Sequence, residues 1–149
     1  MATFTGKWYG LAFSALANKE IDLVGTPDVL KMALTTSAYT PAQDTDNYFD
    51  DVTNELGAGS GYTAGGFTAD NVSFGYTGGT NTWKIDCDDE VVSSTTLTWR
   101  TLVLYDSTPG TAGTNPLIIY QTGDGDTTTT GGTLTIQPHA NGLGTIVIS

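Results

Sequence analysis

The chain has 149 residues, and its 16 acidic side chains outnumber 5 basic ones, which gives a formal net charge of −11 at pH 7. This length provides one domain with a hydrophobic core. The acidity argues against nucleic acid and anionic membranes as partners, because both attract a basic protein face. With one cysteine, Cys87, and one histidine, His139, we expect no intrachain disulfide, no zinc site and no cysteine–histidine catalytic pair.

The N-terminal part of the chain combines an aromatic start with a first clear strand. We expect residues 1–10 to form an extended N-terminal arm whose aromatic side chains reach a neighbouring subunit. Residues 8–23 fit either a helical spacing or a strand alternation, and the sequence leaves this open. The segment 29–36 predicts a strand with one apolar face, made by Leu30, Met32 and Leu34.

A short helical insertion is predicted near residues 41–55. The string Thr40-Pro41-Ala42-Gln43 resembles a capping box, with a hydroxyl at the cap and proline at the first helical position. Apolar residues then recur at helical spacing until Gly57, at Tyr48, Phe49 and Val52.

The rest of the chain indicates β structure. Residues 72–86 alternate around a glycine-rich turn and predict a hairpin. Residues 95–105 predict a central strand, because the second half is apolar on both faces. In this strand Leu97, Trp99, Thr101, Val103 and Tyr105 are expected to share one face.

The last third of the chain continues this pattern. A loop at 107–116 precedes a buried strand at 116–121, and the stretch 123–132 is either a polar loop or the tip of an edge strand. Two further strands, at 133–136 and 145–148, are expected to form a C-terminal hairpin around the turn signal Asn141-Gly142.

Seven or more short strands with one helical insertion indicate a mainly β, antiparallel fold, either a β-sandwich or a small β-barrel. We expect one β-domain that spans residues 1–149.

Two groups of aspartates are candidate calcium ligands, since hard cations take several oxygen ligands from loops with alternating aspartates. The first is Asp124 and Asp126, and the second is Asp86, Asp88 and Asp89. Neither completes a calcium-loop motif, and solvated turns explain both. We therefore expect no cofactor and no metal.

The aromatic residues divide into expected core and expected contact residues. Alternating strand positions favour core packing over a sugar-stacking platform for Trp8, Tyr9, Trp83, Trp99, Tyr105 and Tyr120. Aromatic side chains are also enriched at interface hot spots. The candidates for interface contacts are Trp8, Tyr9, Tyr39, Tyr48, Phe49 and Tyr62.

One segment of the chain contains a series of short motifs. They are Leu34-Thr35-Thr36-Ser37, Tyr39-Thr40-Pro41, Gln43-Asp44-Thr45-Asp46-Asn47-Tyr48, Asn54-Glu55-Leu56 and Gly61-Tyr62-Thr63-Ala64-Gly65-Gly66. In these motifs the chain resembles a family of small structural proteins from tailed-phage particles, in which a strand ending in LTTSSYTP precedes QDTHDY and then a NEV…GTGYTAGG string. The likeness in character extends over most of residues 19–149. One departure is Asp46, where the family string has histidine.

The resemblance implies a non-enzymatic virion protein that decorates or stabilises the capsid shell, as a homo-oligomer in contact with the major capsid protein or other virion proteins. A tail, collar or fibre component of the virion is the close alternative. A carbohydrate-binding or receptor-binding module is a second alternative, and a small hydrolase with paired carboxylates is a third.

Overall fold

The computed structural model of this protein describes residues 4–148 and is mainly antiparallel β in several sheets, a β-sandwich-like fold. This confirms the predicted fold class. The largest sheet has the order β1-β8-β7-β2-β3, formed by Phe4–Trp8, Leu117–Thr128, Thr98–Asp106, Leu30–Thr35 and Phe67–Thr68. A second sheet has the order β10-β5-β4, formed by Gly144–Val147, Thr82–Asp86 and Ser73–Thr77. The third pairs β6 with β9, formed by Glu90–Thr95 and Gly132–Ile136.

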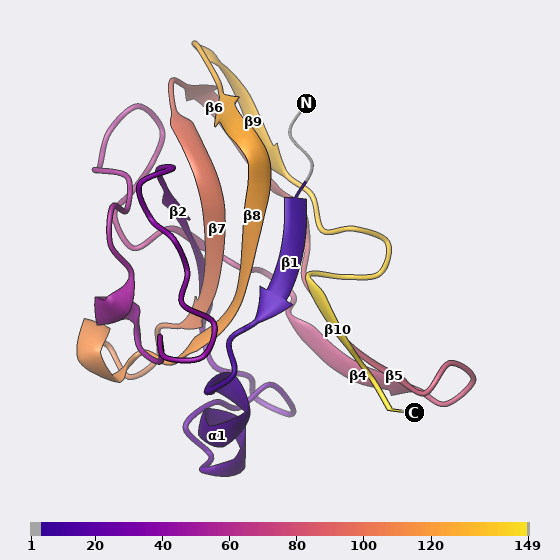
Figure 1. The fold of residues 1–149 in the computed structure, drawn as a ribbon. Coiled ribbons are helices and arrows are strands. Elements are labelled where there is room, and N and C mark those ends of the chain that lie inside the picture. The colour runs from indigo at the N-terminus through magenta and orange to yellow at the C-terminus, as the bar shows by residue number, and fades with distance from the viewer. Residues whose placement is uncertain (1–3, 149) are drawn as a thin grey trace.

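The largest sheet is buried on both faces. On one face, apolar side chains of β2 and β7 pack with residues of the two smaller sheets, including Ile85 of β5 and Leu134 of β9. On the other face, Val103 and Leu117 pack with aromatic residues from the segments around residues 9, 39 and 49. The smaller sheets form the second layer of the sandwich on one side, and an ordered loop region covers the other side (Figure 1).

The sheet β10-β5-β4 extends away from the main sheet (Figure 1). Its hairpin β4–β5 was predicted from residues 72–86 and is confirmed, with Ser73 opposite Asp86 and Thr77 opposite Thr82. The predicted strand over 29–36 is also confirmed, as β2, and its side chains Leu30, Met32 and Leu34 lie in one core cluster.

The central position of β7 is confirmed, since it lies between β8 and β2. The predicted division of its faces is wrong. A register irregularity between Trp99 and Thr101 shifts the alternation, so that Trp99 packs with Leu102 in one cluster and Val103 in the other. Trp99 pairs with Thr127 and Thr101 with Thr122, so residues 99–101 of β7 lie opposite the longer stretch 122–127 of β8, and the regular alternation is interrupted here.

The predicted N-terminal arm is wrong for residues 4–8, which form β1 and pair with β8, and the ring of Phe4 stacks on Trp99 at 4.9 Å. Residues 1–3 lie outside the described residues. The α-helix α1 follows at Ala12–Ala17, in the stretch that the sequence left open.

The helical insertion predicted near 41–55 is only one 3-10 turn, η1 at Phe49–Asp51, and a second such turn, η2, spans Ala112–Thr114. The expected cap at Thr40 does not form because the Asp46 carboxylate accepts the Ala42 N–H at 2.9 Å and closes a turn instead. Within residues 4–148 no helix has the length and apolar content that a bilayer crossing requires.

The predicted C-terminal hairpin is also wrong. β9 pairs with β6, and β10 pairs with β5, so that the two final strands belong to different sheets. The turn at 139–142 forms locally, where Gly142 N–H donates to the His139 carbonyl, and it redirects the chain from one sheet to the other.

Candidate interaction surface

The segment that carries the phage resemblance is bound tightly into the fold through Glu55. One oxygen of this carboxylate accepts the Tyr62 hydroxyl at 2.7 Å and the Gly65 N–H at 2.5 Å. The Tyr62 hydroxyl in turn accepts the Leu34 N–H of β2 at 3.0 Å. The Tyr105 hydroxyl donates to the Gly65 carbonyl at 2.7 Å. These bonds attach the loop to the main sheet, so Glu55, Tyr62 and Tyr105 stabilise the fold.

Three of the predicted interface residues are core side chains. Tyr9, Tyr39 and Tyr62 are at most 5% exposed. The Tyr9 and Tyr39 hydroxyls lie 2.9 Å apart, and Tyr39 donates to Asp46 at 3.0 Å. Burial, the main cause, raises the pKa of both phenols well above the usual range. These rings are packed within the subunit, whereas the sequence pattern made them candidates for contacts at its surface.

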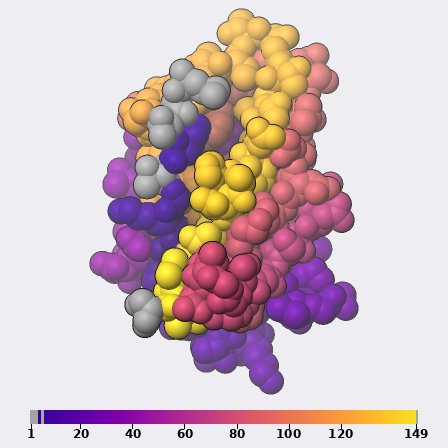
Figure 2. Space-filling model, turned by 90° about the vertical axis from the view of Figure 1, so that its right-hand side faces the viewer, coloured from indigo at the N-terminus to yellow at the C-terminus, as the bar shows by residue number. Residues whose placement is uncertain are grey.

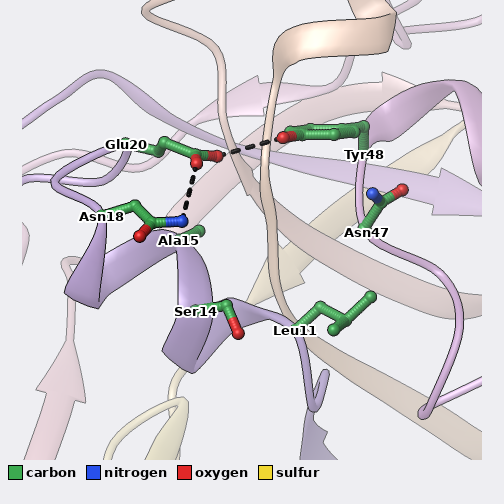
Figure 3. A pocket seen from close by; sticks show the side chains of 7 residues that line it. All are labelled: Leu11, Ser14, Ala15, Asn18, Glu20, Asn47 and Tyr48. Atoms are coloured by element: carbon green, nitrogen blue, oxygen red, sulfur yellow. Dashed lines mark hydrogen bonds between the residues drawn. The ribbon is translucent and has the colours of Figure 1, made fainter.

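Tyr48 and Phe49 are partly exposed. The Phe49 ring stacks on Tyr105 with centroids 4.0 Å apart. The Tyr48 hydroxyl donates to Glu20 at 3.1 Å across a pocket of about 120 Å³, whose other wall is α1 (Figure 3). Three of its polar side chains, Asn18, Glu20 and Tyr48, bond to one another, which leaves them little capacity to bind a ligand.

Five aromatic rings form a continuous row from α1 across β1 to the projecting hairpin, and its three inner rings, Trp8, Phe74 and Trp83, are half-buried. We call it the aromatic row. Phe13 lies 5.5 Å from Trp8, Trp8 lies 6.5 Å from Phe74, and Trp83 lies 4.8 Å from Phe74 and 5.5 Å from Tyr76. The two end rings, Phe13 and Tyr76, are 43% and 47% exposed. Exposed aromatic surface of this kind is typical of contact sites.

The aromatic row includes Trp8 from the predicted interface residues. The sequence placed Trp83 in the core, and it did not identify Phe13, Phe74 or Tyr76. A usable signal was present for the last two, since alternation puts Phe74, Tyr76 and Trp83 on one face of the predicted hairpin. Figure 2 shows the hairpin and the C-terminal strand side by side at the surface that faces the viewer.

A second pocket, of about 220 Å³, lies beside Trp8. Polar and charged groups line it, from Lys7 of β1, Gln121 of β8 and His139 in the final turn. The Trp8 indole N–H donates to the Thr145 carbonyl at 3.2 Å. An aromatic ring next to several hydrogen-bonding side chains can bind a ligand that has both an apolar face and hydroxyl groups.

The candidate calcium ligands are engaged by protein groups. Asp126 lies in β8, where it accepts the Arg100 Nε–H at 2.8 Å, and Asp124 lies in the same strand. The other set is divided among Lys84, Asn71 and Gln137, which bond to Asp86, Asp88 and Asp89 respectively. Among the residues that the structure describes, no three histidine, cysteine or acidic groups are placed to hold a metal ion.

Cys87 is half-buried. Burial and the neighbouring carboxylates, Asp86 first, raise the pKa of its thiol to about 11. The thiol is therefore protonated near neutral pH, and a protonated thiol is a poor nucleophile. His139, the other half of the catalytic pair considered above, accepts the Asn141 N–H through Nδ1.

Comparison with known proteins gives no relative: no protein family, curated protein or solved structure matches this chain.

Proposed function

We propose that this protein is a non-enzymatic structural component of a tailed-phage particle, and that it decorates or stabilises the capsid shell. The sequence resemblance in residues 34–66 motivates the proposal. Under it, the protein acts in the virion, and its partners are the major capsid protein or other virion proteins.

The observation that carries the proposal is the aromatic row with its two exposed ends. Its end rings Phe13 and Tyr76 keep nearly half of their surface accessible, and none of its five members is charged. A shell protein needs an apolar contact surface together with a strongly hydrated exterior, and the net charge of −11 provides the latter. Repetition over a shell then adds avidity to contacts that are individually weak.

The test uses phage particles produced from the genome that encodes this chain. Antibodies against the purified protein should label intact particles over the whole shell. Labelling at one vertex or along the tail would replace the decoration role by a tail, collar or fibre role. Absence from purified particles would overturn the proposal.

A carbohydrate-binding or receptor-binding module is the second candidate, and the pocket beside Trp8 favours it. Trp8 combines with Lys7, Gln121 and His139 in a setting suited to a sugar ring. Glycan binding there should shift the tryptophan fluorescence of the wild-type protein. Trp8→Phe should abolish the shift and Trp99→Phe, which alters a core residue 5% exposed, should retain it. No shift with any glycan of a broad panel would remove this candidate.

A further inference from the structure

The hairpin strand β4 has an open edge. In antiparallel sheets, successive residues turn their backbone groups alternately to the two neighbouring strands. Ile148 N–H donates to the Asn81 carbonyl and Leu143 N–H to the Ile85 carbonyl, each at 2.9 Å, so the odd-numbered residues of β5 face β10. The even-numbered residues of β5 therefore bond to β4 at Ser73, Gly75 and Thr77.

It follows that Phe74 and Tyr76 direct their backbone N–H and carbonyl groups away from the sheet. Among residues 4–148 no strand pairs with this side of β4. Four of the five β4 residues are exposed and Phe74 is partly exposed. The other outer strand, β10, differs, because the Trp8 indole donates to its Thr145 carbonyl.

This edge lacks the usual protection. Proteins prevent edge-to-edge association with charged side chains, prolines or bulges in their outer strands. β4 reads Ser-Phe-Gly-Tyr-Thr and contains no charge and no proline, and its pairing with β5 is regular over all five residues. An unprotected edge beside exposed aromatic rings is the geometry that recruits an additional strand.

The sequence of β4 is complementary to itself. In either direction it has a hydroxyl residue, an aromatic residue, glycine, an aromatic residue and a hydroxyl residue. Two antiparallel copies centred on Gly75 place each Phe74 opposite Tyr76 of the second copy, and each Ser73 opposite Thr77. Cross-strand aromatic pairs stabilise sheets. The two Gly75 residues then form a non-hydrogen-bonded pair, in which the strands approach to about 4.5 Å between Cα atoms.

Charge does not oppose a second copy at this edge. Two chains of net charge −11 repel each other overall, so they associate most readily where no like charges are brought together. β4 has no charged residue to repel its own copy. The nearest charged side chain on β5, Lys84, pairs with Asp86 at 2.9 Å and so is already neutralised.

We propose that a second copy of this chain pairs with the β4 edge, antiparallel and centred on Gly75. The contact is twofold-symmetric and joins the two projecting sheets into one of six strands. The aromatic rings of Phe74 and Tyr76 then form a continuous surface across the two copies. The proposal rests on β4 alone and holds whatever the function of the protein.

Gly75→Lys and Gly75→Glu together test the proposal, because residue 75 lies opposite Lys84 within one subunit and only the lysine variant meets a like charge there. A side chain at Gly75 meets no atom within 4 Å, and no left-handed backbone conformation is required there. In the paired form, however, two lysines lie directly opposite each other across the symmetry axis. Like charges in that position should weaken association at least about a hundredfold. Gly79→Lys, in the hairpin turn with equally open surroundings, is the control of equal charge.

The measurement is molar mass by light scattering during size exclusion, from micromolar to 100 micromolar concentrations. The wild-type chain and Gly79→Lys should have twice the 15.6 kDa chain mass, and Gly75→Lys the mass of one chain. Gly75→Glu alone should also be monomeric, and a mixture with Gly75→Lys should restore the dimer through opposite charges. A monomeric wild-type chain, or a Gly75→Lys dimer as stable as wild type, would overturn the proposal. Antibody labelling of particles tests the proposed function separately, because the dimer at β4 and the role in the virion can each be disproved without the other.

Discussion

Glu55 and Tyr62 form a hydrogen bond of 2.7 Å that holds the loop 55–66 against β2. The same hydroxyl accepts the Leu34 N–H, so one phenol satisfies both a carboxylate and a buried strand N–H. The surface offers a matched pair at Tyr48, whose hydroxyl donates to Glu20 at 3.1 Å. The two tyrosine–glutamate bonds differ mainly in burial.

Tyr62→Phe should therefore lower the free energy of unfolding by about 1.5–3 kcal/mol, because it leaves the Leu34 N–H and Glu55 without their partner. Tyr48→Phe removes a solvent-exposed bond and should change the stability by less than about 0.5 kcal/mol. Urea unfolding followed by tryptophan fluorescence measures both values. Equal losses in the two variants would contradict a structural role for the Glu55–Tyr62 bond.

Gly66 has no room for a side chain. Its φ is +87°, and a Cβ there would lie 2.2 Å from the Met32 carbonyl oxygen of β2. Gly66→Ala should cost about 3 kcal/mol of unfolding free energy, from backbone strain together with displacement of β2. Gly57→Ala is the control, since a Cβ at Gly57 meets nothing within 4 Å. The urea unfolding midpoints of Gly66→Ala and Gly57→Ala are compared. Similar midpoints would show that β2 and this loop can separate freely.

The elements that the sequence predicted well are those formed by contacts close in the chain. Residues 29–36 and the hairpin at 72–86 show their alternation locally, and a short turn sets the hairpin register. The capping-box signal at Thr40 failed for an equally local reason, since Asp46 accepts the Ala42 N–H and closes a turn.

Elements that depend on distant partners could not be predicted. The stretch at 123–128 contains glycine and aspartate, which disfavour strands, yet it extends β8. Contacts from β7 hold it there: Thr98 bonds to Thr128 at 3.1 Å, and Arg100 bonds to Asp126 at 2.8 Å. The aromatic row has the same origin, because Trp8 meets the hairpin ring of Phe74 only once β1 and β4 are placed in space.

Asp106 should make the stability of the protein depend on pH. Its side chain is fully buried. The Thr108 N–H donates to Oδ1 at 2.8 Å, Oδ2 has no donor, and the Asp28 carboxylate interacts with the Asp106 carboxyl group. Burial first, and then Asp28, raises the pKa of Asp106 above its ordinary value. The folded state thus retains a proton that the unfolded state has released. Stability from this proton is complete below pH about 4 and is lost as the pH rises through the folded-state pKa.

Asp106→Asn should remove this pH dependence and raise the melting temperature at pH 7, because the amide can donate to Asp28 and still accept from Thr108. Melting temperatures from pH 4 to 8 give the comparison, and the exposed Asp44→Asn should keep the wild-type slope. An unchanged slope in Asp106→Asn would assign the pH dependence to other groups.

Cys87 should react slowly with thiol reagents in the folded protein. With a pKa of about 11, its thiolate fraction near neutral pH is on the order of a hundredfold below that of a free cysteine. Iodoacetamide alkylation followed by mass spectrometry should therefore be slow at pH 7.5, and its rate should keep rising about tenfold per pH unit up to pH 10. The protein unfolded in urea is the control, because there the thiol loses both its burial and its fixed acidic neighbours. A folded-state rate that levels off near pH 8 would mean that burial and the neighbouring carboxylates do not raise the pKa of Cys87.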